Sequence, residues 1–183
     1  MKSQRFGIEI EMTGLTRRSA ALIIAKHFDT GFRHERGVYD TYSVCDQDGR
    51  KWKIVRDASI TPQCGNRFDY DPDYKVEVVS PICHYEDIET IQSIVRELRR
   101  NGHAKVNESC GIHIHVDASK HTARSLRNIA NIVEEEQDQL KIIEERTGEF
   151  KLDFGQKKSE EQNSLIDEID DNKSIVTLKC KGS

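Results

Sequence analysis

The sequence predicts an α+β protein with a curved, mainly antiparallel sheet and helices packed on its apolar face. Several short segments alternate apolar residues with acidic or imidazole residues, which is the period of a strand with one buried face. Longer segments carry apolar residues at helical spacing along one stripe. Because an antiparallel strand of this kind buries only one face, we expect the striped helices to cover that face.

The N-terminal part predicts a strand, a helix and a hairpin. Residues 5–12 alternate and form the first strand. Thr16 is placed to cap a helix that stops near Gly31. An Asp-Gly turn between two apolar runs then predicts a hairpin, whose strands span residues 42–46 and 51–57.

The middle of the chain predicts a loop, a strand and a second helix. Residues 60–73 contain two prolines and several polar groups, which is typical of a loop. Residues 74–80 alternate again as a strand. A helix is expected from about 85 to 101, with Gly102 as a left-handed C-terminal cap. The apolar face of this helix is expected to comprise Ile88, Ile91, Val95 and Leu98.

The remaining chain predicts a strand over residues 111–117 and a long helix over 119–146. Beyond that helix the pattern weakens into charged and amidic residues. We therefore place one folded domain at residues 1–148 and a polar C-terminal segment at 149–183. This segment ends in one further strand at 174–180.

Composition excludes several classes of function. The 183 residues suffice for one domain, and 28 Lys and Arg against 32 Asp and Glu give a net charge of −4. No attraction to nucleic acid or to an anionic membrane is expected from that balance. No stretch approaches the roughly 20 apolar residues that cross a bilayer. Acidic residues near the start argue against a signal peptide, so we expect a cytoplasmic protein. Five cysteines without C-x-x-C spacing favour reduced thiols over disulfides or a cysteine zinc site.

The polar faces of three predicted strands carry acidic and imidazole side chains, which are those of Glu9, Glu11, Glu77, His113, His115 and Asp117. A single E-x-E or H-x-H strand is most often a solvated strand face. Neighbouring carboxylates, however, raise one another's pKa unless a cation lies between them. Carboxylates with an imidazole suit Mg²⁺ or Mn²⁺, or else Zn²⁺. The residues alone leave a metal site and a solvated face equally open.

Four motifs follow one another within residues 5–146. They are G-I-E-I-E at 7–11, W-K-I-V-R-D-A-S-I at 52–60, V-E-V-V-S-P at 76–81 and S-C-G-I-H-I-H-V-D at 109–117. Together they resemble the amidoligases of the carboxylate–amine ligase superfamily, which also contains glutamine synthetase and glutamate–cysteine ligase. The resemblance implies a glutamine synthetase-like fold and an ATP-dependent ligase. Such an enzyme phosphorylates a carboxylate, and an amine then displaces the phosphate to form an amide.

The resemblance also implies roles for individual residues. Glu11 and Glu77 would hold one Mg²⁺ or Mn²⁺ ion, and Glu9 and His113 would hold a second one nearer the nucleotide phosphates. The implied catalytic residues are Glu77, His115 and Lys179. The implied ATP-binding residues are His113, His115 and Lys53. The implied substrate-binding residues are Asp57, Ser59 and Arg17. The partners would be a small amino acid or peptide carboxylate and an amine. An oligomer is compatible with the superfamily.

Some of these residues have a simpler interpretation. Asp57 and Ser59 suit a local turn, in which a side chain bonds nearby backbone. Lys53 suits an exposed strand position, and Arg17 suits a surface position on the first helix. Trp52 is expected in the core rather than as a platform for adenine.

The C-terminal part departs from the family pattern. Related amidoligases return after the long helix with a strand that carries an arginine, for which Lys179 is the candidate here. Lysine lacks the bidentate fork of arginine. Two alternatives to a working ligase therefore stay open. One is a truncated, non-catalytic remnant that acts as a binding module. The other is a hydrolase in which His113, His115 and Glu9 or Glu11 bind Zn²⁺ and activate water.

Overall fold

The computed structural model describes residues 3–65, 67–68, 71–119, 121–125, 127–128, 150–153 and 175–181. Its strands are β1 (Phe6–Met12), β2 (Phe32–Arg36), β3 (Thr41–Cys45), β4 (Lys51–Val55), β5 (Gln63–Cys64), β6 (Arg67–Phe68), β7 (Val76–Val79), β8 (Gly111–Asp117), β9 (Phe150–Asp153) and β10 (Ile175–Lys181). Its α-helices are α1 (Arg17–His27) and α2 (Ile88–Gly102), and its 3₁₀ turns are η1 (Pro72–Tyr74) and η2 (Tyr85–Asp87).

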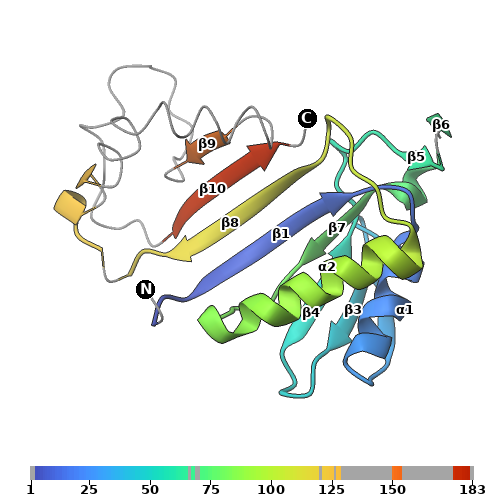
Figure 1. The fold of residues 1–183 in the computed structure, drawn as a ribbon, viewed down its shortest axis with the longest axis horizontal. Coiled ribbons are helices and arrows are strands. Elements are labelled where there is room, and N and C mark those ends of the chain that lie inside the picture. The colour runs from blue at the N-terminus through green and yellow to red at the C-terminus, as the bar shows by residue number, and fades with distance from the viewer. Residues whose placement is uncertain are drawn as a thin grey trace.

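The described strands form one open antiparallel sheet in the order β2-β3-β4-β7-β1-β8-β10-β9, beside the small β5-β6 ribbon (Figure 1). This confirms the α+β class and the antiparallel sheet, whereas a glutamine synthetase-like fold stays a prediction. β1 lies between β7 and β8. The expected final strand exists as β10 and pairs with β8. Strand β2 was not predicted because Phe-Arg-His-Glu-Arg lacks an apolar alternation, and such a charged strand suits its place at the sheet edge.

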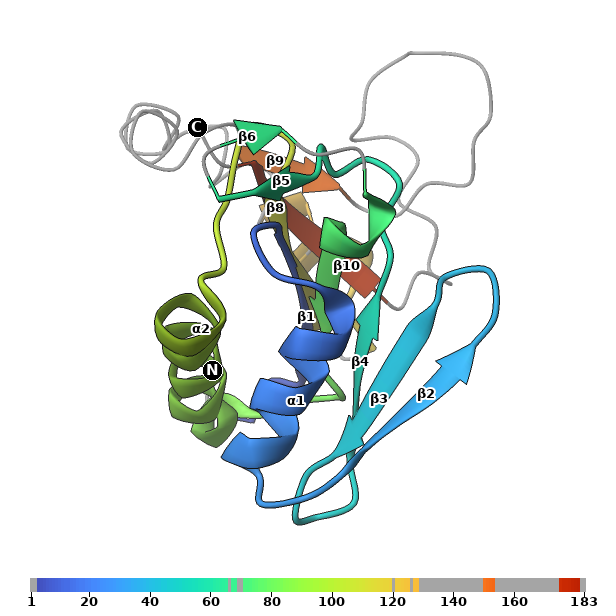
Figure 2. The same cartoon turned by 90° about the vertical axis from the view of Figure 1, so that its right-hand side faces the viewer.

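The helices α1 and α2 pack against each other on one face of the sheet (Figures 1 and 2). Alternate strand residues such as Met12 and Ile54 meet Ile24 from α1 and Leu98 from α2, and each of these side chains is at most 3% exposed. Trp52 is 2% exposed in the same core, which confirms the core interpretation of this residue. The sheet therefore buries its apolar face under the helices, as the alternation predicts.

The two helices differ in how well their ends were predicted. Thr16 caps α1 as expected, since its Oγ1 accepts the N–H of Ser19 at 3.2 Å. The predicted cap of α2 was wrong: Gly102 is still helical, and His103 takes the left-handed conformation with φ 57°. A Cβ on Gly102 would lie 2.8 Å from Ile23 Cδ1. The glycine therefore serves the close packing of α2 on the first helix.

The buried stripe of α2 is also rotated from the prediction. Ile91, Ile94 and Leu98 are 7%, 2% and 1% exposed. Ile88 and Val95, which were expected on this face, are 38% and 36% exposed. Apolar residues spaced by three or by four positions can both lie on one helix face, so the sequence fits more than one buried face. In the structure, the face of α2 that contains Ile94 is buried, and α2 packs against α1.

Several expectations concern the later chain. The helix expected over 119–146 lies largely outside the described residues, although 123–125 and 127–128 are helical. Among the helices that the structure describes, none combines the length and apolar character that a membrane crossing requires. Four cysteines have free thiols, and these are Cys45, Cys64, Cys83 and Cys110.

Candidate functional site

The register of the three central strands gathers the predicted polar residues. Glu9 on β1 lies directly opposite His113 on β8, and Glu11 lies directly opposite Glu77 on β7. These are the pairs that the family resemblance implied for two ions. Directly opposite residues of antiparallel strands share one face of the sheet. The four side chains therefore project from the face that α1 and α2 do not cover.

Glu9 lies between two imidazoles. Its Oε2 is 3.0 Å from His113 Nδ1 and 3.2 Å from His115 Nε2. Burial by itself raises the pKa of Glu9, but the contacts with His113 and His115 outweigh burial and hold it below the usual value. Glu9 is therefore an ionised carboxylate that contacts both imidazole rings.

Glu11 and Glu77 form the buried part of the site, with 5% and 9% of each residue exposed. Glu11 Oε2 accepts the backbone N–H of Gly111 at 2.7 Å, yet burial still raises the pKa of Glu11. Burial, followed by repulsion from Glu9, Asp57 and Glu11, raises the pKa of Glu77 to about 8. Without a cation, Glu77 is therefore mostly protonated near neutral pH.

Asp57 joins this group from the segment after β4. One ligand atom each from Glu11, Asp57 and Glu77 lie within 4.8 Å of one another, as do one each from Glu9, Glu77 and His113. Two three-residue clusters thus share Glu77. Sequence reasoning placed Asp57 with the substrate and missed its proximity to the carboxylates, because the turn that redirects the chain after β4 leaves no periodic pattern.

The local turn expected at this position is also present. Asp57 Oδ1 accepts both the N–H and the Oγ hydrogen of Ser59, each at 2.6 Å. This turn fixes Asp57 at the rim of the site and leaves its second carboxylate oxygen outside these two bonds. Ser59 is exposed beside it.

The donor set of the two clusters fits a divalent cation. Carboxylate oxygens are the ligands that Mg²⁺ prefers, and one imidazole among them is compatible with Mn²⁺. Burial, followed by repulsion from the neighbouring carboxylates, raises the pKa of Glu77, and a cation between these groups would relieve that repulsion. The donor types and their spacing therefore suit a divalent cation.

Two lysines flank the Glu9–His113 pair in the register of the sheet. Lys179 of β10 lies opposite His113, and Lys53 of β4 lies opposite Val79, which in turn lies opposite Glu9. One row across the sheet thus runs from Lys53 through Val79, Glu9 and His113 to Lys179. Lys53 is exposed, which agrees with the simpler interpretation of that residue and leaves it available at the surface.

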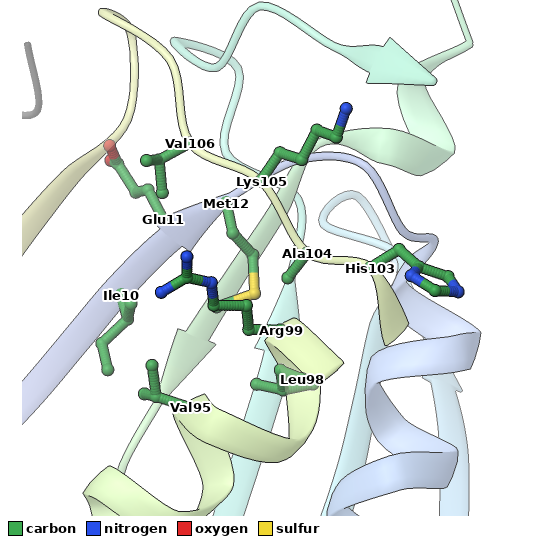
Figure 3. A pocket seen from close by; sticks show the side chains of 10 residues that line it. All are labelled: Ile10, Glu11, Met12, Val95, Leu98, Arg99, His103, Ala104, Lys105 and Val106. Carbon is green, nitrogen blue, oxygen red and sulfur yellow. The ribbon is translucent and has the colours of Figure 1, made fainter. Parts of the chain in front are cut away.

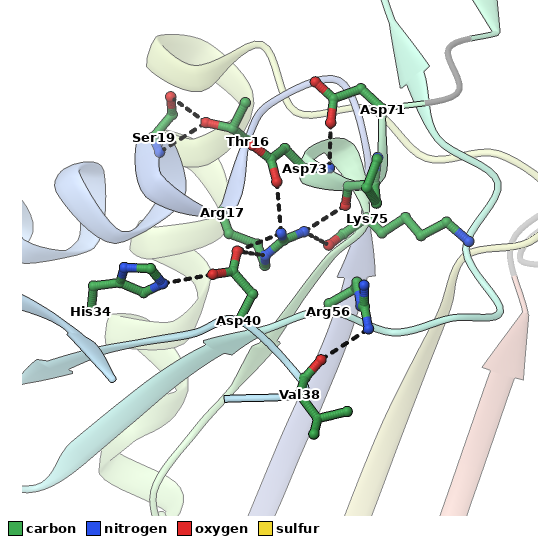
Figure 4. Close-up of polar contacts among 11 residues, drawn as sticks. Thr16, Arg17, Ser19, His34, Val38, Asp40, Arg56, Asp71, Asp73 and Lys75 are labelled. Carbon is green, nitrogen blue, oxygen red and sulfur yellow. Dashed lines mark hydrogen bonds and ion pairs between the residues drawn. The ribbon is translucent and has the colours of Figure 1, made fainter. Parts of the chain in front are cut away.

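Arg17 differs from its expected surface position. Its side chain is only 3% exposed, so the prediction of a surface arginine was wrong. Figure 4 shows the guanidinium enclosed by Asp40, Asp73 and the backbone next to Lys75. The sequence could not reveal this burial, because the acidic partners come from turns far away along the chain.

Asp117 separates from the other residues of the polar face. It accepts the N–H of Ser119 at 3.0 Å and the Nε–H of Arg5 at 2.8 Å. The bonds from Ser119, followed by that from Arg5, lower the pKa of Asp117 to about 2. Its carboxylate lies at the end of β8 and does not belong to either cluster.

A pocket of about 680 Å³ lies on the other side of β1, between that strand and the end of α2 (Figure 3). Its lining is largely apolar and includes Ile10, Val95 and Leu98. Because Ile10 alternates with the acidic residues of β1, this pocket belongs to the helix side of the sheet. Glu11 of the Glu11–Asp57–Glu77 cluster is also among the residues that line it.

The fold and site define an α+β protein that gathers acidic and imidazole groups on the open face of an antiparallel sheet. A family model described as "Putative amidoligase enzyme" matches residues 2–171 of the chain. The chain therefore belongs to the amidoligase family, whose description is that of an amide-bond-forming ligase. No curated protein matches the chain significantly in sequence.

Proposed function

We propose that the chain is an ATP- and Mg²⁺-dependent carboxylate–amine ligase that forms an amide through an acyl-phosphate intermediate. The observation that carries this proposal is the pair of clusters that share Glu77, in a chain of the amidoligase family. Phosphoryl transfer depends on cations that neutralise phosphate oxygens, and carboxylates are suited to hold them. The substrates would be a small amino acid or peptide carboxylate and an amine.

The residues of each cluster would hold one cation. Glu11, Asp57 and Glu77 would hold Mg²⁺ on the side of the carboxylate substrate, and Glu9, Glu77 and His113 would hold a second ion on the nucleotide side. Bound ions would supply charge neutralisation for the transferring phosphoryl group. Because the pKa of Glu77 is about 8, cation binding at neutral pH would release its proton.

The other residues would orient the reactants. His115 has its Nε2 beside Glu9 and would lie next to the nucleotide phosphates. Lys53 and Lys179 occupy register positions on either side of the Glu9–His113 row, where cationic groups would hold phosphate oxygens. Lys179 would take the part that an arginine plays in related amidoligases, and as a point charge it would hold the acyl phosphate less rigidly. Ser59 lies at the rim, where the carboxylate substrate would enter.

Ligand-dependent unfolding tests this function first. The chain is heated with EDTA, with Mg²⁺ alone, with Zn²⁺ alone, and with Mg²⁺ plus a non-hydrolysable ATP analogue. A ligand at 100 times its Kd stabilises a protein by about 2.7 kcal/mol, or about 5–10 °C at this size. We expect the full shift to require Mg²⁺ and nucleotide together, with a smaller one from Mg²⁺ alone. A shift with Zn²⁺ alone would instead favour a metal-dependent hydrolase, and no shift in any condition would favour a non-catalytic remnant.

Hydroxylamine trapping tests the chemistry. An acyl phosphate formed from ATP and a carboxylic acid reacts with hydroxylamine to give a hydroxamate and phosphate, with ADP as the other product. Pools of amino acids and short peptides are therefore incubated with ATP, Mg²⁺ and hydroxylamine. Hydroxamate that depends on ATP and disappears in Glu11→Gln supports the ligase. ATP consumption without hydroxamate for any acid would contradict the proposed intermediate.

A further inference from the structure

Arg17 is a buried cation whose guanidinium makes five hydrogen bonds. Nε and Nη2 donate to Asp40 Oδ2 at 3.1 and 2.6 Å, and Nη2 also donates to Asp73 Oδ1 at 2.8 Å. Nη1 donates to the carbonyl oxygens of Pro72 and Lys75 at 2.6 and 3.0 Å. A guanidinium has only five N–H groups, so these bonds use all of them. Arg17 has no donor left for the substrate that sequence reasoning assigned to it.

Most of these partners lie in one segment, residues 72–75, which is next to a carboxylate of the site in the sequence. The segment 72–75 runs directly into β7, which carries Glu77. Lys75 Nζ in turn donates to the carbonyl oxygen of Ala58 at 2.7 Å. Arg17 therefore fixes segment 72–75. Because Ala58 follows Asp57, the bond from Lys75 in this segment holds one side of the turn around Asp57.

The remaining partner, Asp40, belongs to a turn that bonds to the opposite side of the turn around Asp57. Asp40 ends the turn 37–40, whose backbone bonds to the residue just before Asp57 (Figure 4). The N–H of Arg56 donates to the carbonyl oxygen of Tyr39, and its Nη2 donates to that of Val38, both at 2.9 Å. Arg17 is therefore linked to both sides of Asp57: through segment 72–75 to Ala58, and through turn 37–40 to Arg56.

We infer that Arg17 is a positioning residue that sets the geometry of the Glu11–Asp57–Glu77 cluster through Asp57. The inference rests on the proposed function, because it treats that cluster as a cation site. Arginine suits this role since its planar fork reaches two carboxylates and two carbonyls at once, which a lysine with its compact ammonium group cannot reproduce. Its burial adds to the constraint, because a displaced guanidinium would leave a charge without partners in the protein interior.

A double-mutant cycle on Mn²⁺ binding tests this inference. The affinity of the full chain for Mn²⁺ is measured by the EPR signal of the free ion for the native chain, Arg17→Lys, Asp57→Asn and the double variant. Supporting residues behind metal ligands typically contribute about 10-fold or more to metal affinity. We expect Arg17→Lys to weaken Mn²⁺ binding about 10-fold in the native background and to have little further effect in Asp57→Asn.

Two further variants separate positioning from general stability. Arg50→Lys is the matched control, because Arg50 also bonds two acids, Asp46 and Asp87, but at the other end of β4. It is expected to lower the unfolding temperature and to leave Mn²⁺ affinity unchanged. Lys75→Met keeps the carbonyl that Arg17 binds and removes only the bond to Ala58. If Arg17→Lys does not fold, Lys75→Met replaces it in the cycle with the same expected result.

The outcomes separate the positioning role of Arg17 from the proposed function of the site. If the native chain binds Mn²⁺ and Arg17→Lys binds it equally well, the inference fails and the proposed function stands. An equal loss in the native and Asp57→Asn backgrounds also overturns the inference, since Arg17 would not act through Asp57. A native chain that binds no Mn²⁺ overturns the proposed function and this inference with it.

Discussion

Glu11 and Glu77 lie directly opposite each other on β1 and β7, with only 5% and 9% of each residue exposed. Facing carboxylates repel when both are ionised, and burial strengthens the penalty. Asp57 adds a third carboxylate to the same place. The fold thus holds a group of acids that destabilises the cation-free chain, as is common where binding or chemistry takes place.

Replacing Glu77 with glutamine is expected to stabilise the cation-free protein. The variant removes a buried ionisable group while keeping the shape of the side chain, and we expect a gain of about 1 kcal/mol at pH 8, or about 2–4 °C. The same variant should lose stabilisation by Mg²⁺ with nucleotide. Thermal unfolding in EDTA and with both ligands checks the two effects. Glu89→Gln on α2 is the control, because the Glu89 side chain is 80% exposed.

The cation-free protein is expected to lose stability as pH rises from about 5 to 8. Glu77 has a folded-state pKa of about 8, above its unfolded value of 4.5. Between these values the folded state holds a proton that the unfolded state has lost, so the free energy of unfolding decreases with increasing pH. Urea unfolding in EDTA at several pH values measures this slope. A slope that is the same in Glu77→Gln would assign it to other groups.

The two imidazoles are expected to have different functions. His113 belongs to a cluster with Glu9 and Glu77, so His113→Gln should weaken Mn²⁺ binding at least about 10-fold. His115 contacts Glu9 but lies outside that cluster, so His115→Gln should weaken the ATP analogue more than it weakens Mn²⁺. Calorimetric titrations of both ligands into both variants check the difference. Identical losses in the two variants would contradict it.

Gly14 is expected to be intolerant of a side chain. Its φ is 84°, and a Cβ there would lie 2.8 Å from the carbonyl oxygen of His103. The neighbouring backbone cannot yield as a flexible side chain would, so Gly14→Ala should destabilise the protein by about 2 kcal/mol. Chemical unfolding measures this cost. Gly31→Ala is the matched control, since no atom lies within 4 Å of its Cβ position, and it should change stability little.

Alternation along the strands predicted which polar residues share a face, because period-two patterns fix the side to which each side chain projects. The family resemblance paired Glu9 with His113 and Glu11 with Glu77, and the strand register places the members of each pair directly opposite each other. The pairing itself depends on register, which the apolar faces constrain strongly. The identity of any bound ion and the reaction stay predictions.

Contacts between irregular segments could not be predicted in this way. Arg17 looks like an exposed helix residue in the sequence, because Asp40 and Asp73 come from turns without periodicity. The chain reversal that brings Asp57 next to Glu77 is equally invisible to periodic patterns. The end of α2 was misplaced for a related reason: His103 adopts a conformation that glycine favours, while Gly102 is needed for packing.

The strand order also determines when the site can form. β1 at residues 6–12 pairs with β7 at 76–79 and with β8 at 111–117, and β8 pairs with β10 at 175–181. Such non-local pairings make folding slow, because long loops must close before the strands meet. The facing acids of β1 and β7 begin to repel only at that closure. A divalent cation bound to these acids would favour the folded state by mass action and so stabilise the pairing of β1 with β7.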